Sequence, residues 1–256
     1  MSDFDREVIE RIDAMARNES LKNDALQFIR SSNSPRYSYN FAWMSRPIIQ
    51  YPQDIVAMQE LIWRIRPDLI IEAGIAHGGS LIFNASMLAL LDMSDAIESG
   101  VSLDPARSHR KVLGIDIDIR AHNRDAIEKH PMASRIHMIQ GSSIAPDVVA
   151  EVKSIAGDYE TVLVILDSNH THDHVRAELE AYAPLATVGS YCVVFDTVIE
   201  DLTADESSDR SWGPGDNPKT AVWDYLKTHD EFEIDESIHN KLLITVAPDG
   251  YLKRVR

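Results

Sequence analysis

Short apolar runs alternate with helix-forming segments over most of this chain. Runs rich in Val, Ile and Leu begin near residues 69, 111, 136, 162 and 191. The segments between them predict helices at 80–92, near 121–130, at 145–155 and at 172–183. Near-continuous apolar runs are typical of strands buried on both faces, and their alternation with helices indicates a parallel sheet covered on both sides. The pattern therefore predicts an α/β fold.

The two ends of the chain depart from this alternation. Residues 1–52 combine helical periodicity with a loop rich in aromatic side chains, and residues 53–256 are expected to form the main domain. A polar stretch with Gly and Pro, about 201–217, predicts an insertion or lid within that domain. The pattern after residue 230 predicts two final strands, with an Asp249–Gly250 turn inside the last one.

A glycine-rich turn follows the first strand, in the stretch Leu69–Ser80. Gly74, Gly78 and Gly79 would let a ligand approach the backbone, and the following helix offers free N–H groups. Their G-x-x-x-G-G spacing differs from the G-x-G-x-x-G of dinucleotide sites. Glu72, at the end of the strand, would repel a pyrophosphate and suits a cationic or hydroxyl-bearing ligand. The turn therefore matches the S-adenosylmethionine loop of methyltransferases better than an NAD site.

Ligands of open parallel sheets bind beyond the carboxyl ends of the strands, so the residues that close each strand are candidates. Asp116 closes the second strand, where an acid can accept hydrogen bonds from two ribose hydroxyls. Asp118 is the weaker candidate, and a helix cap is the alternative role for Asp116. The third strand is closed by Gly141, Ser142 and Ser143, which could frame an adenine or form an ordinary turn.

Acidic and histidine side chains close the fourth and fifth strands. Asp167 and Asp196 fall at neighbouring strand tips, and two such carboxylates can share one hard cation such as Mg²⁺. The cation would lower the pKa of a bound substrate hydroxyl, and Asp167 or His170 would take its proton. The three nearby histidines also permit a transition-metal site, although on a helix only His170 and His174 share a face. For His172 and His174 we expect helix-start and surface positions.

Composition limits the class of protein. The formal net charge of −16 argues against nucleic acid or an anionic membrane as the main partner. The single cysteine, Cys192, excludes an intrachain disulfide and lies in an apolar strand, where a buried structural thiol is expected. The N-terminus has no signal-peptide core, and no apolar run approaches the roughly 20 residues of a membrane span. A cytoplasmic protein without membrane insertion is expected.

These motifs resemble the cephalosporin hydroxylase-like family of adenosylmethionine-dependent methyltransferases, which includes rhamnosyl O-methyltransferases. The similarity covers roughly residues 37–256, and its most specific block begins YNFAWMSRPIIQYPQDIVAMQELIW and runs through IIEAGIAHGGSL. LDSNHTHDHV, VVFDTVIED and NPKTAVWDYL are further marks. The resemblance implies a Rossmann-like class I methyltransferase fold: a seven-stranded, mostly parallel sheet with an antiparallel last strand and helices on both faces.

The resemblance also implies the site and its cofactors, S-adenosyl-L-methionine and Mg²⁺. The cofactor contacts would fall on Glu72, Gly74, His77, Gly78, Gly79, Ser80 and Asp116. The strand-four acid of the metal site falls on Asp167. The acidic pair after strand five falls on Phe195–Asp196, so only Asp196 keeps a carboxylate. Asp173, Glu200 or Asp201 are candidates for the missing oxygen.

Substrate specificity is expected to come from the aromatic segment and the lid. Tyr39, Trp43, Arg46 and Trp212 could stack on a sugar face and hydrogen-bond its hydroxyls, or could pin their loops to the core. The prediction is a Mg²⁺-assisted O-methyltransferase that acts on a hydroxyl of a sugar, glycosylated metabolite or polysaccharide, and that forms a homo-oligomer by analogy of fold.

Three alternatives come from other classes of function. A hydroxylase that uses Fe(II) and 2-oxoglutarate usually has an H-x-D motif on an antiparallel barrel, and this chain has no such motif. An NAD-dependent oxidoreductase fits the alternating architecture but not the glycine spacing. A non-catalytic protein that binds the cofactor is disfavoured by the acids at the strand tips.

Overall fold

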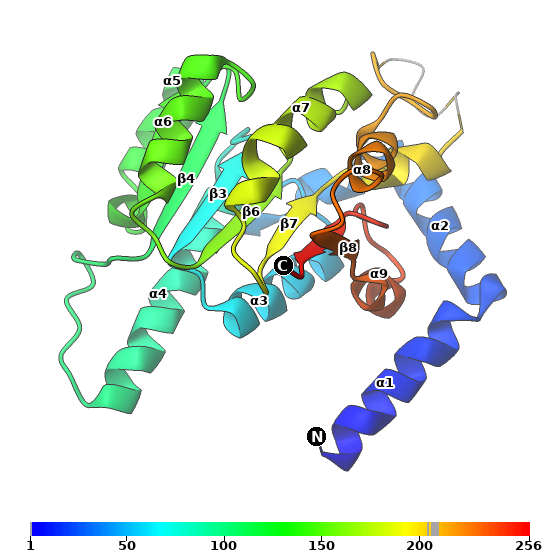
Figure 1. Ribbon diagram of the computed structural model, residues 1–256, viewed down its shortest axis with the longest axis horizontal. Helices are drawn as coiled ribbons and strands as arrows, with labels where there is room; N and C mark the ends of the chain where they lie inside the picture. Colours follow the sequence, from blue (N-terminus) through cyan, green and yellow to red (C-terminus); the bar gives the residue numbers. More distant parts are fainter. Residues whose placement is uncertain (1, 204, 206–209) are drawn as a thin grey trace.

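A seven-stranded sheet lies at the centre of this computed structural model, which describes residues 2–203, 205 and 210–256 (Figure 1). The order of the described strands is β5-β4-β3-β6-β7-β9-β8. Their bounds are β3 (Leu69–Ala73), β4 (Lys111–Asp116), β5 (Ile136–Gln140), β6 (Val162–Leu166), β7 (Tyr191–Val194), β8 (Phe232–Ile234) and β9 (Tyr251–Arg254). Neighbours from β5 to β7 pair in parallel, and β9 pairs antiparallel with both β7 and β8. The predicted class I methyltransferase topology is confirmed.

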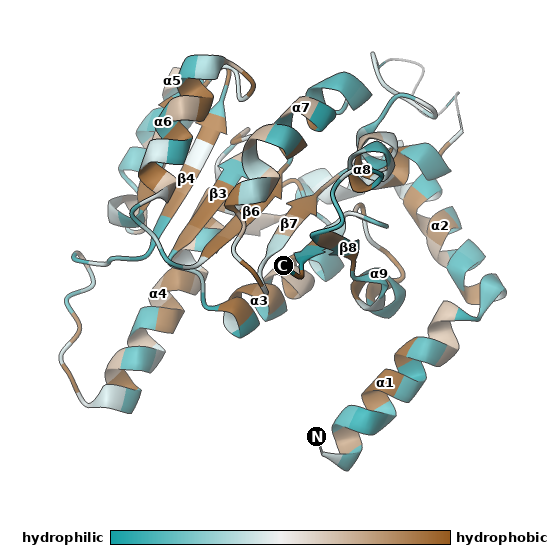
Figure 2. Cartoon of the chain, in the orientation of Figure 1, coloured by the Kyte–Doolittle hydropathy of each residue, from teal (hydrophilic) through white to brown (hydrophobic). Residues whose placement is uncertain are grey.

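Helices cover both faces of this sheet, as the alternating pattern predicts (Figure 1). Their bounds are α1 (Asp3–Ala16), α2 (Glu19–Asn33), α3 (Pro52–Ile65), α4 (Gly79–Ser99), α5 (Ala121–Glu128), α6 (Pro146–Ala156), α7 (His172–Tyr182), α8 (Pro218–Leu226) and α9 (Glu236–Leu242). Ile70, Ile165 and Val193 belong to a core cluster that contains α3 and α4 side chains. The other core cluster contains Val164 and Cys192 with side chains of α6, α7 and α8. Figure 2 shows the central strands largely in brown, and the thiol is buried as predicted.

The C-terminal segment differs from the prediction of two final strands, because a helix and an irregular stretch occupy part of it. Residues 236–242 form α9, and the backbone that follows turns toward α3 before β9 begins. The cause is a long-range contact: Asp54 of α3 accepts hydrogen bonds from the Val246 N–H at 3.1 Å and from the Thr245 hydroxyl. An N–H committed to a carboxylate is not available to a strand ladder. The predicted Asp249–Gly250 turn is present, but it precedes β9.

The N-terminal segment packs against the main body at several places. The described part of α1 buries no side chain and packs against α9, whereas α2 buries Ala25 and Ile29 (Figure 1). The aromatic stretch forms a small hairpin of β1 (Ala42–Trp43) and β2 (Arg46–Pro47). This hairpin lies on α4, where the Trp43 ring meets Phe83 edge-on at 4.9 Å.

The helix α4 runs for 21 residues and is long and apolar enough to span a bilayer by length and composition. The expectation from the sequence, that no apolar run approaches that length, is therefore too strict. Half of the apolar window is buried against the sheet and the hairpin. A helix at the core of a globular domain can have the same length and apolar composition as a membrane span, and the burial of α4 is typical of such a core helix.

The start of α4 also generates a prediction. A Cβ at Gly79 would lie 2.1 Å from the Pro47 carbonyl oxygen, and this backbone has no flexible end that can move aside. Gly79→Ala is therefore expected to lower the free energy of unfolding by about 1–3 kcal/mol, the usual cost of overpacking. Gly157→Ala is the control, since its φ is −62° and the nearest atom would lie at 3.4 Å. Urea unfolding of both variants measures the difference; equal stabilities would contradict the close packing of the hairpin on α4.

Candidate active site

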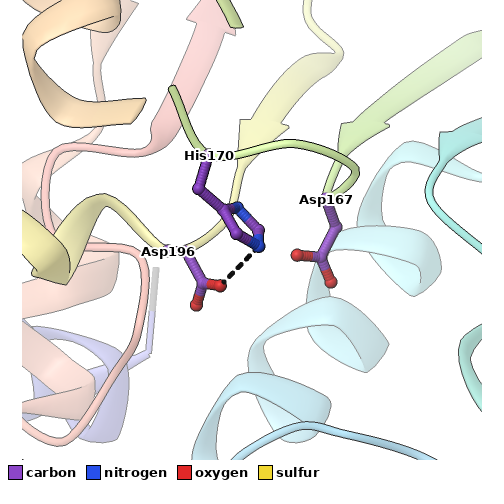
Figure 3. Close-up of side chains that lie close together, drawn as sticks. All are labelled: Asp167, His170 and Asp196. Atoms are coloured by element: carbon purple, nitrogen blue, oxygen red, sulfur yellow. Dashed lines mark ion pairs between the residues drawn. The ribbon is translucent and has the colours of Figure 1, made fainter. Parts of the chain in front are cut away.

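Three side chains meet at the carboxyl ends of β6 and β7 (Figure 3). Asp167 directly follows β6, His170 lies three residues further, and Asp196 begins the turn after β7. One ligand atom from each lies within 4.8 Å of the others, and His170 Nε2 is 3.2 Å from Asp196 Oδ2. Two carboxylates and an imidazole at this spacing form a donor set that can hold one divalent cation. The predicted pair of acids and the predicted histidine are thus brought together.

Backbone pairing explains why these side chains meet. The ladder continues beyond the named strands, because the Asp167 N–H donates to the Ala73 carbonyl at 2.8 Å and the Phe195 N–H to Leu166 at 3.0 Å. Parallel strands end at the same edge of a sheet, so the acids that follow them are neighbours. Asp196 has φ +57°, a left-handed conformation that Asp tolerates better than most residues, and it leads into the short turn Thr197–Asp201.

Phe195 stands where the family resemblance implies the first acid of a pair, and it is not a member of the cluster. Its ring is buried in the apolar core beside α3, so it offers nothing to a cation. Two of the three acids proposed to supply the missing metal ligand, Glu200 and Asp201, have other partners in the described part of the chain. Glu200 accepts from the Gly215 N–H at 2.7 Å, and Asp201 accepts from the Lys219 ammonium at 2.7 Å. The third, Asp173, does not belong to the cluster.

Burial raises the pKa of Asp167 well above its usual range, and the negative charges of Asp196 and Glu72 raise it further. Gln50, from the segment before α3, donates from Nε2 to Asp167 Oδ2 at 3.2 Å. Its own Oε1 is buried and has no hydrogen-bond partner among the residues that the structure describes. Gln50 was not predicted from the sequence, since nothing near it in the chain indicates that it reaches a strand tip.

A cavity of about 220 Å³ opens beside Asp167. Four predicted cofactor residues line it: Gly74, Asp116, Ser142 and Ser143. Asp116 Oδ2 accepts from the N–H groups of Ile75 and Ala76 at 2.8 and 3.2 Å, so this acid also holds the glycine turn in place. The cavity therefore joins the tips of β3, β4, β5 and β6.

The glycines of the turn have packing roles. Gly74 has φ +98°, and a Cβ there would lie 2.0 Å from the Asp167 carbonyl oxygen. Gly78 has φ +81° and lies against Ile127, and a Cβ at Gly141 would meet Val148 at 2.7 Å. Of these glycines, Gly74 lines the 220 Å³ cavity. For Gly78, Gly79 and Gly141, and for the His77 side chain in the same turn, direct contact with a cofactor stays a prediction.

Glu72 and Ser80 lie on the other side of Asp167, at a small cavity of about 20 Å³. Glu72 is 1% exposed and accepts from the Ser80 hydroxyl and from Asn84 Nδ2, the latter at 2.7 Å. Burial raises the pKa of Glu72 to about 7. Within the described part of the chain, the Asn84 Oδ1 atom is buried without a hydrogen-bond partner, as is Gln50 Oε1. Among the described residues, these two amide oxygens without donors line the cavity beside apolar side chains such as Met58 and Phe195, so its polar part suits a donor group of a ligand.

The predicted substrate contacts divide into three groups. Trp212 of the lid meets the His170 ring edge-on at 4.9 Å, so it lies at the cluster. Trp43 donates to Ser86 Oγ at 3.0 Å, and Arg46 donates to the His77 carbonyl at 3.0 Å. Both side chains therefore hold the hairpin against other parts of the chain. Tyr39 is 47% exposed, beside the Arg36 guanidinium. Residues 204 and 206–209 of the predicted lid lie outside the described residues.

The two remaining histidines of the motif have different surroundings. His172 lies at the start of α7, as expected, with Nδ1 2.9 Å from Thr220 Oγ1. For His174 the expectation of a surface position is wrong, because this residue lines the 220 Å³ cavity and its Nε2 is 3.0 Å from Ser143 Oγ. His174 and Glu178 are four residues apart, and residues at this spacing lie on the same face of a helix. This spacing could have indicated from the sequence that the two side chains share the inner face of α7.

The fold and this edge of the sheet define the class of protein: an α/β protein with the class I methyltransferase topology and an acidic cluster beside the expected cofactor cavity. A family model described as Rhamnosyl O-methyltransferase/CmcI matches residues 35–255. The chain belongs to this family, which confirms the resemblance found in its motifs.

Relatives and solved structures agree with this assignment. The chain is 28% identical to the rhamnosyl O-methyltransferase of Mycobacterium bovis (strain BCG / Pasteur 1173P2) over 206 residues, 78% of this chain and 73% of the relative. It is 28% identical to that of Mycobacterium leprae (strain TN) over 214 residues, 83% and 82% of the two chains. CmcI with Mg and SAM has a TM-score of 0.55 at 18% identity, covering 85% of this chain and 78% of CmcI. An apo form of CmcI gives 0.54 at 18% identity, with 85% and 77% covered. At this identity the structural likeness shows the fold.

The buried Glu72 generates a prediction about pH. Its pKa is raised from 4.5 to about 7, so the folded protein binds this proton more tightly than the unfolded chain. The free energy of unfolding should therefore fall as the pH rises through this window and level off above about 7. At about 1.4 kcal/mol per pKa unit, the contribution is about 3 kcal/mol.

Glu72→Gln removes the titrating carboxyl group. The fall in the free energy of unfolding between pH 4.5 and about 7 should therefore be smaller in this variant by about 3 kcal/mol. Urea unfolding at steps across the window measures it. Glu151→Gln, an exposed acid on α6, is the control and should keep the wild-type slope. An unchanged slope in Glu72→Gln would show that Glu72 is ionised in the folded protein at low pH.

Proposed function

We propose that this protein is an S-adenosyl-L-methionine-dependent, Mg²⁺-assisted O-methyltransferase that acts on a hydroxyl of a sugar or of a glycosylated metabolite. The observation that carries the proposal is the juxtaposition of the 220 Å³ cavity with the cluster of Asp167, His170 and Asp196. A methyl donor in the cavity and an acceptor at the cluster would meet at Asp167, which belongs to both.

The cavity fits the methyl donor. Asp116 would accept hydrogen bonds from the ribose hydroxyls at the tip of β4, and Gly74 leaves room at the backbone. Glu72, Ser80 and the unpartnered oxygens around the small cavity suit a methionine ammonium group. Support from the family comes from CmcI, a solved member with Mg and SAM bound.

The cluster fits a divalent cation, because a carboxylate oxygen of Asp167 and one of Asp196 lie within 4.8 Å of each other. Asp167 and Asp196 would hold the ion. A cation bound there would orient the acceptor hydroxyl and lower its pKa.

The protein supplies proton transfer and positioning itself. His170 Nε2 lies 3.2 Å from Asp196 Oδ2, which orients the imidazole. Because the nitrogen that donates to a carboxylate has no free lone pair, the other ring nitrogen, Nδ1, would accept the proton of the acceptor hydroxyl. Trp212, edge-on to His170, would offer an apolar wall for one face of a sugar ring. The glycine turn and the Asp167 backbone, in contact at Gly74, would keep donor and acceptor in a fixed relation.

The proposed class of acceptor, a sugar hydroxyl, rests on the relatives. Curated relatives over most of this chain are rhamnosyl O-methyltransferases.

Two alternative functions fit the structure less well. The alternative of a 2-oxoglutarate-dependent hydroxylase conflicts with the parallel sheet, since that class is built on an antiparallel barrel. An NAD-dependent oxidoreductase is disfavoured by Glu72 at the end of β3 and by the glycine spacing.

The proposal is tested by methyl transfer from labelled S-adenosyl-L-methionine to a set of rhamnosides, with Mg²⁺ and after EDTA. Asp196→Asn should lower turnover by at least about 10- to 100-fold, the usual cost of losing a group that only supports a metal ligand. His170→Ala should lower turnover about 100-fold or more, the contribution of a general base. Both variants should keep their affinity for S-adenosylhomocysteine, because neither residue lines the cavity. Glu151→Gln is the control.

Two results would contradict this account. Full turnover of Asp196→Asn in EDTA would show that no cation is needed at the cluster. Failure of the wild-type protein to bind S-adenosylhomocysteine would show that the cavity is not a methyl-donor site, and the proposed function would then be wrong as a whole.

A further inference from the structure

The first turn of α7 places a histidine in the wall of the 220 Å³ cavity. His174 lines it together with Ser143, which follows β5, and Ser168, which follows β6. Its Nε2 lies 3.0 Å from Ser143 Oγ and 3.5 Å from Ser168 Oγ. The side chain is 20% exposed, so a ligand in the cavity can reach it.

A buried carboxylate fixes the orientation of this ring. Glu178, one turn further along α7, is fully buried, and its Oε1 lies 3.4 Å from His174 Nε2 and accepts from Ser168 Oγ at 2.6 Å. Because a carboxylate only accepts, Nε2 is the donor on this side, and a neutral ring then has an acceptor at Nδ1. Within the described residues, Nδ1 has no hydrogen-bond partner.

The position of His174 in the cavity indicates which part of a ligand it would meet. One end of the cavity is at Asp167, where the reacting methyl group of the proposed cofactor must lie. His174 and Ser143 form a polar wall elsewhere in the cavity, near the tips of β4 and β5. Ile117, directly after Asp116, also lines the cavity although it is 72% exposed. An apolar side chain and a polar wall together suit a flat heterocycle with a polar edge.

We propose that His174 recognises the base of the cofactor, with Nδ1 accepting a hydrogen bond from the exocyclic amine of adenine. This inference rests on the proposed function and adds a specificity-determining residue to it. Glu178 is a positioning residue, since it acts by holding the imidazole. A hypoxanthine base carries a carbonyl oxygen in place of the amine, so two acceptors would face each other without a proton between them. The site should therefore prefer adenine.

Isothermal titration calorimetry with S-adenosylhomocysteine and S-inosylhomocysteine tests this. The wild-type protein should bind the adenosyl compound about tenfold more tightly, or more, which corresponds to one hydrogen bond. In His174→Ala, affinity for the adenosyl compound should fall about tenfold and the preference should drop below about twofold. His174→Asn, which keeps an acceptor, should retain part of the preference and serves if the alanine variant does not fold.

His172→Ala is the matched control. His172 lies on the same turn of α7, contacts Thr220 and does not line the cavity, so both affinities should stay at wild-type values. Each preference is a ratio measured on one preparation, so a fraction of unfolded protein does not change it. Equal binding of the two compounds by the wild type, or an undiminished preference in both His174 variants, would overturn the inference. Binding of neither compound by the wild type would instead reject the proposed function.

Discussion

Parallel pairing of β6 with β3 and β7 fixes the site, because the backbone ladder runs up to the residues that carry the chemistry. The N–H of Asp167 bonds to the carbonyl at the end of β3, and the N–H of Phe195 bonds to the carbonyl at the end of β6. Gly74 lies so close to the Asp167 carbonyl that no side chain fits between them. A shift of one residue in either pairing would turn the acids to the other face of the sheet. The cluster and the cavity thus share one rigid edge.

Several buried carboxyl groups lie close together at that edge of the sheet. Burial raises the pKa of Glu72 to about 7 and of Asp54 to about 6, and the pKa of Asp167 is raised as well. Each of these groups costs folding free energy when it is ionised. The neighbouring amide oxygens of Gln50 and Asn84 have no hydrogen-bond donors in residues 2–203, 205 and 210–256. A cation at the cluster and a cationic methyl donor would offset this unfavourable field, so the same arrangement that costs stability favours binding of positively charged ligands.

Much of the fold could be predicted from the sequence, because apolar periodicity reports directly on burial. Asp116, Asp167 and Asp196 could be predicted too, since strand ends define the ligand edge of a parallel sheet. The remaining features depend on contacts between distant parts of the chain. Asp54 redirects residues 245–246 away from a strand, and Gln50 reaches Asp167 from a segment more than 100 positions earlier. Aromatic content alone could not tell that Trp43 braces α4 whereas Trp212 lies at the cluster.

The central claim is that methyl donor and metal occupy adjoining positions at this edge of the sheet. A crystal structure of the protein with S-adenosylhomocysteine and Mn²⁺, recorded with anomalous scattering, tests it most directly. The account predicts a single manganese peak within coordination distance of Asp167 and Asp196, with the nucleoside in the cavity lined by Asp116, Ser143 and His174. A manganese peak elsewhere, or a nucleoside bound outside that cavity, would contradict it.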